Sequence, residues 1–446
     1  MTTPVHDPVE GTAKPPRSRR ALVAGSVGNF IEWYEFGVYG YFATVIAANF
    51  FTPDGGSDAE ALVKTYASFA LAFFFRPVGA AVFGRVGDRM GRRPTLILVI
   101  LLMTGATTLI GLLPTYATLG AAAPWLLTLL RILQGLSAGG EFGGAASIMT
   151  EFAPPGKRGL YGAWQSFTVA LGLLAGAGMA ALLATVLTEP ELNGWGWRLP
   201  FLLTLPLGLA ALWLRLKLEE SPSFRRTRTG TSDAGGHPQA VVPAPAPARE
   251  VALAIALGAG RLMGWSAAGY TFLVVMPSYL QSTLNATFQQ ALVATVLANL
   301  GFAASIIPAG SLSDRIGRRP VMVAGAVLVA VLAFPLLHLL QNHAASTAAK
   351  SLAVFVAGAI VGLMAGPGPA MLAEMFPTSV RYTGLGLAYS LSNAVFSGCA
   401  GLIITEAIQR TGNIDIPAHY VVVTCAVSTL ALLTLRGDNH RRALRD

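Results

Sequence analysis

Two copies of one short motif decide how this chain folds. Residues 84–94 read GRVGDRMGRRP and residues 310–320 read GSLSDRIGRRP, with the aspartate, the arginines and the proline at matching places. The spacing Glu-x-x-Pro-x-x-x-Arg at residues 151–158 also returns at residues 374–381, at nearly the same offset. Such long-range repetition indicates that each half of the chain is a copy of one structural unit.

The composition places these two units in a membrane. The chain has 446 residues, of which 53% are hydrophobic and 12% are charged, against about 25% charged in an ordinary soluble domain. A span of the hydrocarbon core needs about 20 apolar residues. Twelve stretches meet this length, near 20–49, 62–84, 94–114, 122–150, 158–187, 196–216, 250–281, 288–312, 320–340, 347–374, 381–408 and 416–436.

A polar, Pro/Ala-rich stretch at residues 218–249 divides these spans into six and six. We therefore predict an all-α membrane protein, with twelve transmembrane helices in two pseudo-symmetric six-helix bundles. The predicted parts are an N-terminal tail (1–20), a first bundle (21–217), a linker (218–249), a second bundle (250–436) and a C-terminal tail (437–446).

The distribution of basic residues predicts the orientation. Of the 31 Lys and Arg residues, 24 fall in the tails and in the loops on one side of the twelve spans. The positive-inside rule makes that side cytoplasmic and places both termini there. The first twenty residues lack a small-residue cleavage site, so we expect no signal peptide. Because the net charge of +9 follows topology, it does not indicate a nucleic-acid partner.

The repeated motif and four further segments resemble a known family. GxxxDRxGRRP between spans two and three, and again between spans eight and nine, is similar to the major facilitator superfamily. The segments 28–36 (GNFIEWYEF), 76–77 (RP), 131–141 (RILQGLSAGGE) and 374–384 (EMFPTSVRYTG) resemble its metabolite:proton symporter family. The resemblance implies alternating access, with the substrate held between the two bundles.

Four charged residues within the spans are candidates for proton coupling. Glu32 and Glu35 lie three residues apart, about 4.5 Å along one helix axis. Two carboxylates that close in a poorly solvated site should not both ionise, so one is expected to carry a proton. The alternative is that they only bond to nearby groups at the cytoplasmic mouth. Arg131 matches a position that the resemblance links to proton coupling, or it clamps two helices; Glu141 faces either the cavity or a neighbouring backbone.

Four other polar residues are candidates for substrate binding. Arg76 and Arg261 lie deep in their spans, where a guanidinium can hold a substrate carboxylate. The partner of Arg76 is expected to be Glu32 or Glu35, and Arg261 can instead extend to the membrane surface. Gln165 and Asn393 can complete a pocket, although hydrogen bonding between helices is the commoner role of such residues.

The repeated motif itself predicts a cytoplasmic gate. Its aspartate can accept hydrogen bonds from arginines and from a helix N-terminus, and its second glycine permits a tight reversal. Such a cluster can latch the state that is closed to the cytoplasm, whereas a topology anchor would need the arginines alone. The predicted gate residues are Gly84, Asp88, Arg89, Gly91, Arg92, Arg93, Asp314, Arg315, Gly317, Arg318 and Arg319.

These features predict a secondary transporter rather than an enzyme. No GxxxxGK[ST] segment is present, so we expect coupling to a proton gradient and no cofactor or metal. One proton crossing 100 mV supplies about 2.3 kcal/mol, enough for nearly 50-fold accumulation of a neutral solute. We expect proton symport of a small carboxylate-bearing metabolite by a monomer in the lipid bilayer of the cell (inner) membrane.

The resemblance does not determine which substrate is carried. Residues 36–40 (FGVYG) look more like the members that carry proline or glycine betaine. The alternatives are an organic acid such as 2-oxoglutarate, citrate or shikimate, or the export of drugs by proton antiport.

Overall fold

The structure is a computed structural model that describes residues 17–52, 57–90, 92–139, 142, 146, 149–150, 153–216, 248–377 and 380–435. These residues are mainly helical, and no strand occurs among them. The prediction of an all-α chain is therefore confirmed.

The helices fall into two sets, which we call the N-terminal and C-terminal bundles. The N-terminal bundle (residues 17–216) contains α1 (Arg17–Tyr41), α2 (Ala43–Ile46), η1 (Ala47–Phe51), α3 (Asp58–Phe74), α4 (Arg76–Met90), α5 (Arg92–Leu112), α6 (Tyr116–Leu119), α7 (Ala122–Ala138), α9 (Arg158–Val186), α10 (Glu189–Glu191), η2 (Leu192–Gly196) and α11 (Arg198–Leu216). The C-terminal bundle (residues 248–435) contains α13 (Ala248–Tyr270), η3 (Thr271–Val275), α14 (Met276–Ser282), α15 (Phe288–Ile316), α16 (Arg318–Gln341), α17 (Thr347–Ala365), α18 (Gly368–Met375), α19 (Arg381–Ser392), η4 (Asn393–Gly398), α20 (Ala400–Thr411) and α21 (Ile416–Leu433).

Helix occurs in every one of the twelve predicted spans. Eight helices in the described ranges are long and apolar enough to cross a membrane, or nine if the bent pair at residues 189–214 is one span. The other predicted spans are shorter or more charged. The apolar part of α5 covers only Ile97–Leu112, α7 has 17 residues, and α1 carries three arginines and two glutamates.

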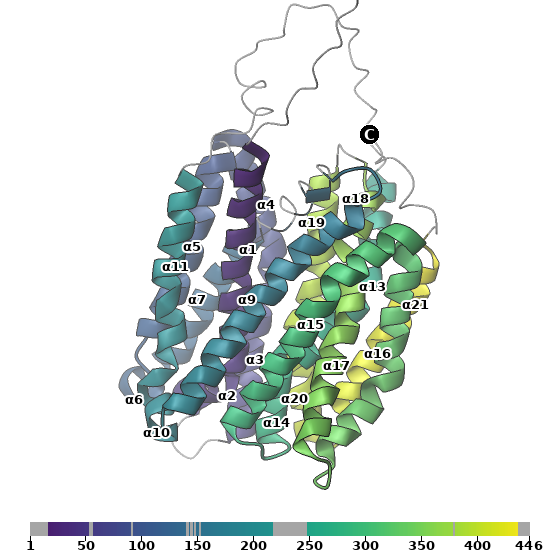
Figure 1. Cartoon of the computed structure of the whole chain (residues 1–446). Coiled ribbons are helices and arrows are strands. Elements are labelled where there is room, and N and C mark those ends of the chain that lie inside the picture. The colour runs from purple at the N-terminus through teal and green to yellow at the C-terminus, as the bar shows by residue number, and fades with distance from the viewer. Residues whose placement is uncertain are drawn as a thin grey trace, which may run out of the picture.

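The two bundles stand side by side, and α9 crosses obliquely between them (Figure 1). It packs along α1 of its own bundle and along α15 of the other. Near one end of this crossing, a Cβ at Gly159 would lie 2.5 Å from the carbonyl oxygen of Gly310. The two glycines therefore let α9 and α15 approach more closely than larger residues would allow.

Some of the long helical runs are interrupted within their length. The π-helical segments η3 and η4 lie inside the two long helical runs of residues 248–282 and 381–411. Helix α3 ends at Phe74 and α4 begins at Arg76, so a single turn residue separates them. π-helical segments inside α-helices are frequent at functional sites, and the candidate site described below lies next to these interruptions.

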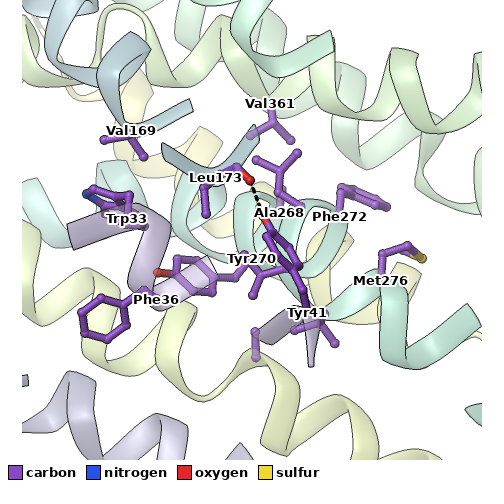
Figure 2. Close-up of a cluster of buried hydrophobic side chains, with 14 of the residues drawn as sticks. Trp33, Phe36, Tyr41, Val169, Leu173, Ala268, Tyr270, Phe272, Met276 and Val361 are labelled. Carbon is purple, nitrogen blue, oxygen red and sulfur yellow. Dashed lines mark hydrogen bonds between the residues drawn. The ribbon is translucent and has the colours of Figure 1, made fainter. Parts of the chain in front are cut away.

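Aromatic side chains from both bundles meet in the core. Figure 2 shows Trp33 and Phe36 of α1 beside Tyr270 of α13. The ring centroids of Trp33 and Tyr270 are 6.1 Å apart, and those of Phe73 and Tyr270 are 5.3 Å apart. This aromatic cluster therefore fills the seam between the bundles.

Candidate functional site

An ion pair lies inside the aromatic cluster. The Nη1 atom of Arg76 is 3.3 Å from Oε1 of Glu32, and both side chains are at most 5% exposed. The sequence left Glu32 and Glu35 open as partners of Arg76, and the structure records the ion pair with Glu32. The guanidinium also lies over two rings, 4.3 Å from the centroid of Phe36 and 4.2 Å from that of Phe73. Arg76 is thus held by one carboxylate and by cation–π contacts.

Several buried donors beside this ion pair have no acceptor among the residues that the structure describes. Nε and Nη2 of Arg76 are buried without a hydrogen-bond partner in the described part of the chain, and so is the hydroxyl of Tyr270. A buried donor left unsatisfied costs about 1–3 kcal/mol, and more when it is charged. The cluster therefore has guanidinium N–H groups and a hydroxyl that can donate hydrogen bonds to a bound ligand.

A second polar group lies deeper in the N-terminal bundle. Oε2 of Glu35 accepts a hydrogen bond from Thr107 at 2.8 Å, and Thr107 accepts one from Gln134 at 2.6 Å. Oε1 of Gln134 in turn accepts from Nη1 of Arg131 at 2.7 Å. Glu35, Gln134 and Arg131 are each 0% exposed. Hydrogen bonds thus connect Glu35 to Arg131 through two neutral side chains.

The two polar groups share one aromatic ring. The guanidinium of Arg131 lies 4.9 Å from the centroid of Phe36, the ring that Arg76 also contacts. Tyr39 and Phe69 cover the rest of Arg131 at 4.1 and 4.9 Å. Glu32 and Glu35 therefore have different arginine neighbours, although they lie three residues apart on one helix.

The C-terminal bundle contributes mainly rings to this region. Tyr389 of α19 stacks on Phe142, with ring centroids 3.3 Å apart, and it lies 6.0 Å from Trp265. The ring of Tyr270 lies 6.1 Å from that of Trp33 and 5.3 Å from that of Phe73, two rings that contact the guanidinium of Arg76. The ion pair thus lies within reach of both bundles.

The other predicted substrate-binding residues lie in separate hydrogen-bond groups. Gln165 contacts Asn29, which donates to its backbone oxygen at 3.2 Å, so these residues join α9 to α1. Asn393, the first residue of η4, donates to the backbone oxygen of Tyr389 at 3.0 Å. Asn393 thus bonds to the backbone one helical turn earlier, at the residue whose ring stacks on Phe142.

Arg261 lies in a different place from the other arginines. It donates to the backbone oxygen of Ala431 at 3.3 Å and to the hydroxyl of Thr434 at 2.8 Å, and its Nη1 is 3.2 Å from Sδ of Met375. All three partners belong to the C-terminal bundle. These contacts fit a clamp between α13 and the end of α21, so we leave Arg261 out of the proposed site.

The second copy of the repeated motif joins the two bundles at one face. Oδ1 and Oδ2 of Asp314 accept from the backbone N–H groups of Gly159 and Leu160 at 2.7 and 2.9 Å. These groups belong to the first turn of α9, where a carboxylate is favoured by the helix dipole. Asp314 also accepts from Arg318 at 2.7 Å. We call this end of the molecule, with Arg158, Arg318 and Arg381, the arginine-rich face.

A glutamate outside the motif completes this network. Oε1 of Glu374 lies 2.9 Å from Nη2 of Arg318 and 3.6 Å from Nη1 of Arg158. Glu374 therefore links two arginines from different bundles. Glu374 and Arg158 were not among the predicted gate residues, although their place in the Glu-x-x-Pro-x-x-x-Arg repeat was a signal for them.

Gly317 turns the chain between the two helices that carry the second copy of the motif. Gly317 has φ of 101° between α15 and α16, a conformation that glycine adopts readily. Arg315 is exposed and Arg319 is half-buried. Glu141 and Gly91 lie outside the described residues. So do the side chains of the first copy of the motif, at Gly84, Asp88, Arg89, Arg92 and Arg93.

The bundles also touch at the face opposite to the arginine-rich one. Tyr66 and Ser278 share a hydrogen bond of 2.8 Å between their hydroxyls, and Thr44 donates to Gln281 at 3.1 Å. A cavity of about 100 Å³ lies beside these contacts, lined by residues of α3, α14 and α20. The structure therefore has contacts between the bundles on both sides of the ion pair.

Two helical bundles that enclose buried charges at their seam define the class of membrane transporters with two repeated halves. A model of the sugar (and other) transporter family matches residues 21–255, and a model of the Major Facilitator Superfamily matches residues 262–444. The chain belongs to the major facilitator superfamily, which confirms the resemblance at this level.

Relatives of known sequence match nearly the whole chain. The proline/betaine transporter of Escherichia coli is 33% identical over 428 residues, 95% of this chain and 84% of that protein. The glycine betaine/proline/ectoine/pipecolic acid transporter OusA of Dickeya dadantii is 33% identical and covers 94% and 83%. The ectoine/proline transporter ProP of Corynebacterium glutamicum is 33% identical and covers 96% and 86%.

Solved structures agree on the fold. The D-xylose-proton symporter has a TM-score of 0.73 at 20% identity, with 94% of this chain and 97% of that chain covered. The inward-open xylose transporter XylE of Escherichia coli has a TM-score of 0.70 at 18% identity, with 93% and 95% covered.

Proposed function

We propose that the protein is a secondary transporter that takes up a small zwitterionic metabolite of the proline/betaine type together with protons. The observation that carries this proposal is the buried guanidinium of Arg76, whose Nε and Nη2 have no acceptor among the described residues. A substrate carboxylate would supply acceptors to both atoms, as planar guanidinium groups favour. The sequence relatives are named for proline, betaine and ectoine, which supports a substrate of this kind.

The proton is assigned to the acidic groups of α1. Glu35 is fully buried, and a hydroxyl and an amide connect it to Arg131. A carboxylate in such a site can hold a proton in one state of the transporter and release it in another when its surroundings change. We assign the proton to Glu35, with Arg131 as its charged neighbour. Glu141 stays a predicted participant.

The network at the arginine-rich face is proposed as the cytoplasmic gate. Asp314, Arg318 and Glu374 tie the first turn of α9 to the C-terminal bundle. These bonds must break before the bundles can separate at this face. The distribution of basic residues in the sequence predicts that this face is cytoplasmic. In this proposal both termini lie on the cytoplasmic side of the cell membrane, and the protein acts as a monomer of the metabolite:proton symporter family.

Uptake into proteoliposomes tests the proposal. Radiolabelled proline and glycine betaine are offered under an imposed pH gradient, with the interior alkaline. We expect accumulation above the external concentration, and we expect a protonophore to abolish it. Arg76→Gln should reduce uptake at least about 30-fold, because it removes the charge that binds the carboxylate. Lys64→Gln, at an exposed surface pair, is the matched control. Uptake that is the same without the pH gradient and in the Arg76→Gln variant would contradict the proposal.

An organic-acid symporter is the second candidate, and Arg131 is the observation that favours it. Nε and Nη2 of Arg131 also lack an acceptor among the described residues. Two guanidiniums, 4.3 and 4.9 Å from the centroid of Phe36, could receive two carboxylates. Preferential uptake of 2-oxoglutarate or citrate over betaine in the same assay would support this candidate.

A further inference from the structure

We propose that the Glu32–Arg76 ion pair is the receptor for both ends of a zwitterion, which inserts between the two side chains. The substrate carboxylate takes the place of Glu32 on Arg76, and the substrate ammonium takes the place of Arg76 on Glu32. This inference rests on the proposed function. It adds that Glu32 is a specificity-determining residue, and it leaves the proton to Glu35.

The geometry of the ion pair supports an exchange of partners. The contact between the two groups, from Nη1 of Arg76 to Oε1 of Glu32, measures 3.3 Å, which is longer than the 2.7–2.9 Å of a good charged hydrogen bond. The Nε and Nη2 edge of the same guanidinium is buried without an acceptor in the described ranges. A ligand carboxylate can therefore form a better pair with Arg76 than Glu32 does here.

Charge balance selects the class of ligand. The ion pair is neutral as a whole, and it is almost fully buried. A zwitterion adds one charge of each sign, so every buried charge keeps an opposite neighbour after insertion. An anion of the same shape would occupy Arg76 and separate Glu32 from this arginine, and breaking a buried ion pair without replacing its cation is strongly unfavourable.

The rings around the ion pair fit the cationic end of the ligand. Phe36 and Phe73 contact the guanidinium of Arg76, at 4.3 and 4.2 Å from their centroids, so Trp33 and Tyr270 are the rings offered to the ligand cation. Trp33 lies 5.5 Å from the same guanidinium and 6.1 Å from the ring of Tyr270. Ring faces bind quaternary ammonium groups, which have no N–H to donate. A secondary ammonium can also donate to Glu32, so both betaine and proline can be bound.

The seam between the bundles makes this site conditional on closure. Glu32, Trp33 and Arg76 belong to the N-terminal bundle, whereas Tyr270 belongs to the C-terminal bundle. A ligand cation is enclosed from both sides only when the bundles meet. Charge selection is therefore strongest in the closed state, which is the state that transport must pass through.

A carbon isostere of glycine betaine separates charge from shape. In 3,3-dimethylbutanoate a carbon replaces the quaternary nitrogen, so the ligand keeps its size and carboxylate but becomes an anion. Competition with labelled betaine on purified wild-type protein should show weaker binding of the isostere by about 30-fold or more. Equal affinities for the two ligands would overturn the inference, and this comparison needs no variant.

The variant Glu32→Gln tests the residue itself. We expect it to weaken betaine binding at least about 30-fold, while binding of 3,3-dimethylbutanoate is retained or improved, because the competing negative charge is gone. Glu60→Gln, which alters an exposed carboxylate, should leave both affinities unchanged. Retained isostere binding also shows that Glu32→Gln is folded. An unchanged ratio of the two affinities in Glu32→Gln would overturn the inference.

The outcomes distinguish this inference from the proposed function. Proton-driven betaine uptake with no discrimination against the isostere contradicts the inference alone. Wild-type protein that neither binds nor takes up betaine and proline contradicts both.

Discussion

Single residues carry the charges on which transport depends, and Glu35 gives the sharpest prediction at this scale. Its carboxylate is fully buried, and it accepts a hydrogen bond from Thr107 at 2.8 Å. Glu35→Gln keeps the size and the hydrogen bond but removes the group that we assign to the proton.

We expect Glu35→Gln to abolish uphill accumulation under a pH gradient while it leaves exchange of labelled for unlabelled substrate within about threefold, a small change on the scale of binding free energies. Both rates are measured in proteoliposomes. Accumulation at the wild-type level by the variant would exclude Glu35 as the proton carrier.

Asp415 gives a residue-scale prediction about pH. Gln341 donates to its Oδ1 at 2.8 Å, and His338 lies 3.4 Å from its Oδ2. Chiefly the bond from Gln341, with help from His338, holds the pKa of the Asp415 carboxyl below its usual range. The ionised carboxylate therefore stabilises the fold above about pH 4, the ordinary pKa of Asp, and this contribution is lost as the pH falls through the lowered pKa.

Asp415→Asn should consequently lower the thermal stability of the detergent-solubilised protein at pH 7, and the difference from wild type should shrink below about pH 4. Thermal unfolding measured at several pH values checks this. A difference that stays constant down to about pH 3 would contradict the assigned role of Asp415.

At the scale of helices, substitution of glycines tests how closely α7 packs against α3. A Cβ at Gly135 of α7 would lie 1.9 Å from the backbone oxygen of Ala72 in α3, whereas a Cβ at Gly105 of α5 would meet nothing within 4 Å. The two helical glycines form a matched pair, because the same substitution is crowded at one and free at the other.

Gly135→Ala should destabilise the protein by about 1–3 kcal/mol, because α7 must move away from α3. Gly105→Ala should be neutral or stabilising by up to about 1 kcal/mol, since alanine favours helix. Unfolding of both variants in detergent is compared with wild type. Equal effects of the two substitutions would contradict the packing of α3 on α7.

The sequence predicted where helices occur better than it predicted which side chains contact each other. Apolar runs of about 20 residues determine where helices can cross a membrane, so helix occurs in all the predicted spans. The positions of the charged residues reduced the possible partners of Arg76 to two carboxylates. The sequence could not distinguish Glu32 from Glu35, because they lie on neighbouring faces of one helix and only the position of Arg76 relative to α1 separates them. The rings of Tyr270 and Tyr389 were missed because aromatic residues are common in spans.

At the scale of the whole molecule, the account depends on two bundles that separate and rejoin. The contacts of Asp314 with the first turn of α9 hold the arginine-rich face together. Asp314→Asn replaces one acceptor oxygen by an N–H₂ group, which cannot accept from both backbone groups. We therefore expect the bundles to separate more often at this face.

A thiol reporter measures this opening. Ser166, fully buried on α9 and bonded to the backbone oxygen of Ala365, is replaced by Cys in a protein whose Cys399 and Cys425 are changed to Ala. Asp314→Asn should raise the labelling rate at residue 166 about fivefold or more, which corresponds to about 1 kcal/mol. Lys64→Gln, at an exposed surface pair outside the motif, is the control. Equal labelling in all three proteins would indicate that the motif anchors topology only.

The most direct test of the central claim is the proton movement that accompanies the substrate. Glycine betaine is added to de-energised proteoliposomes, and the external pH is followed. Proton symport predicts that the medium becomes more alkaline with wild-type protein and stays constant with Glu35→Gln. Uptake of betaine without any change in pH, or with acidification of the medium, would contradict the account.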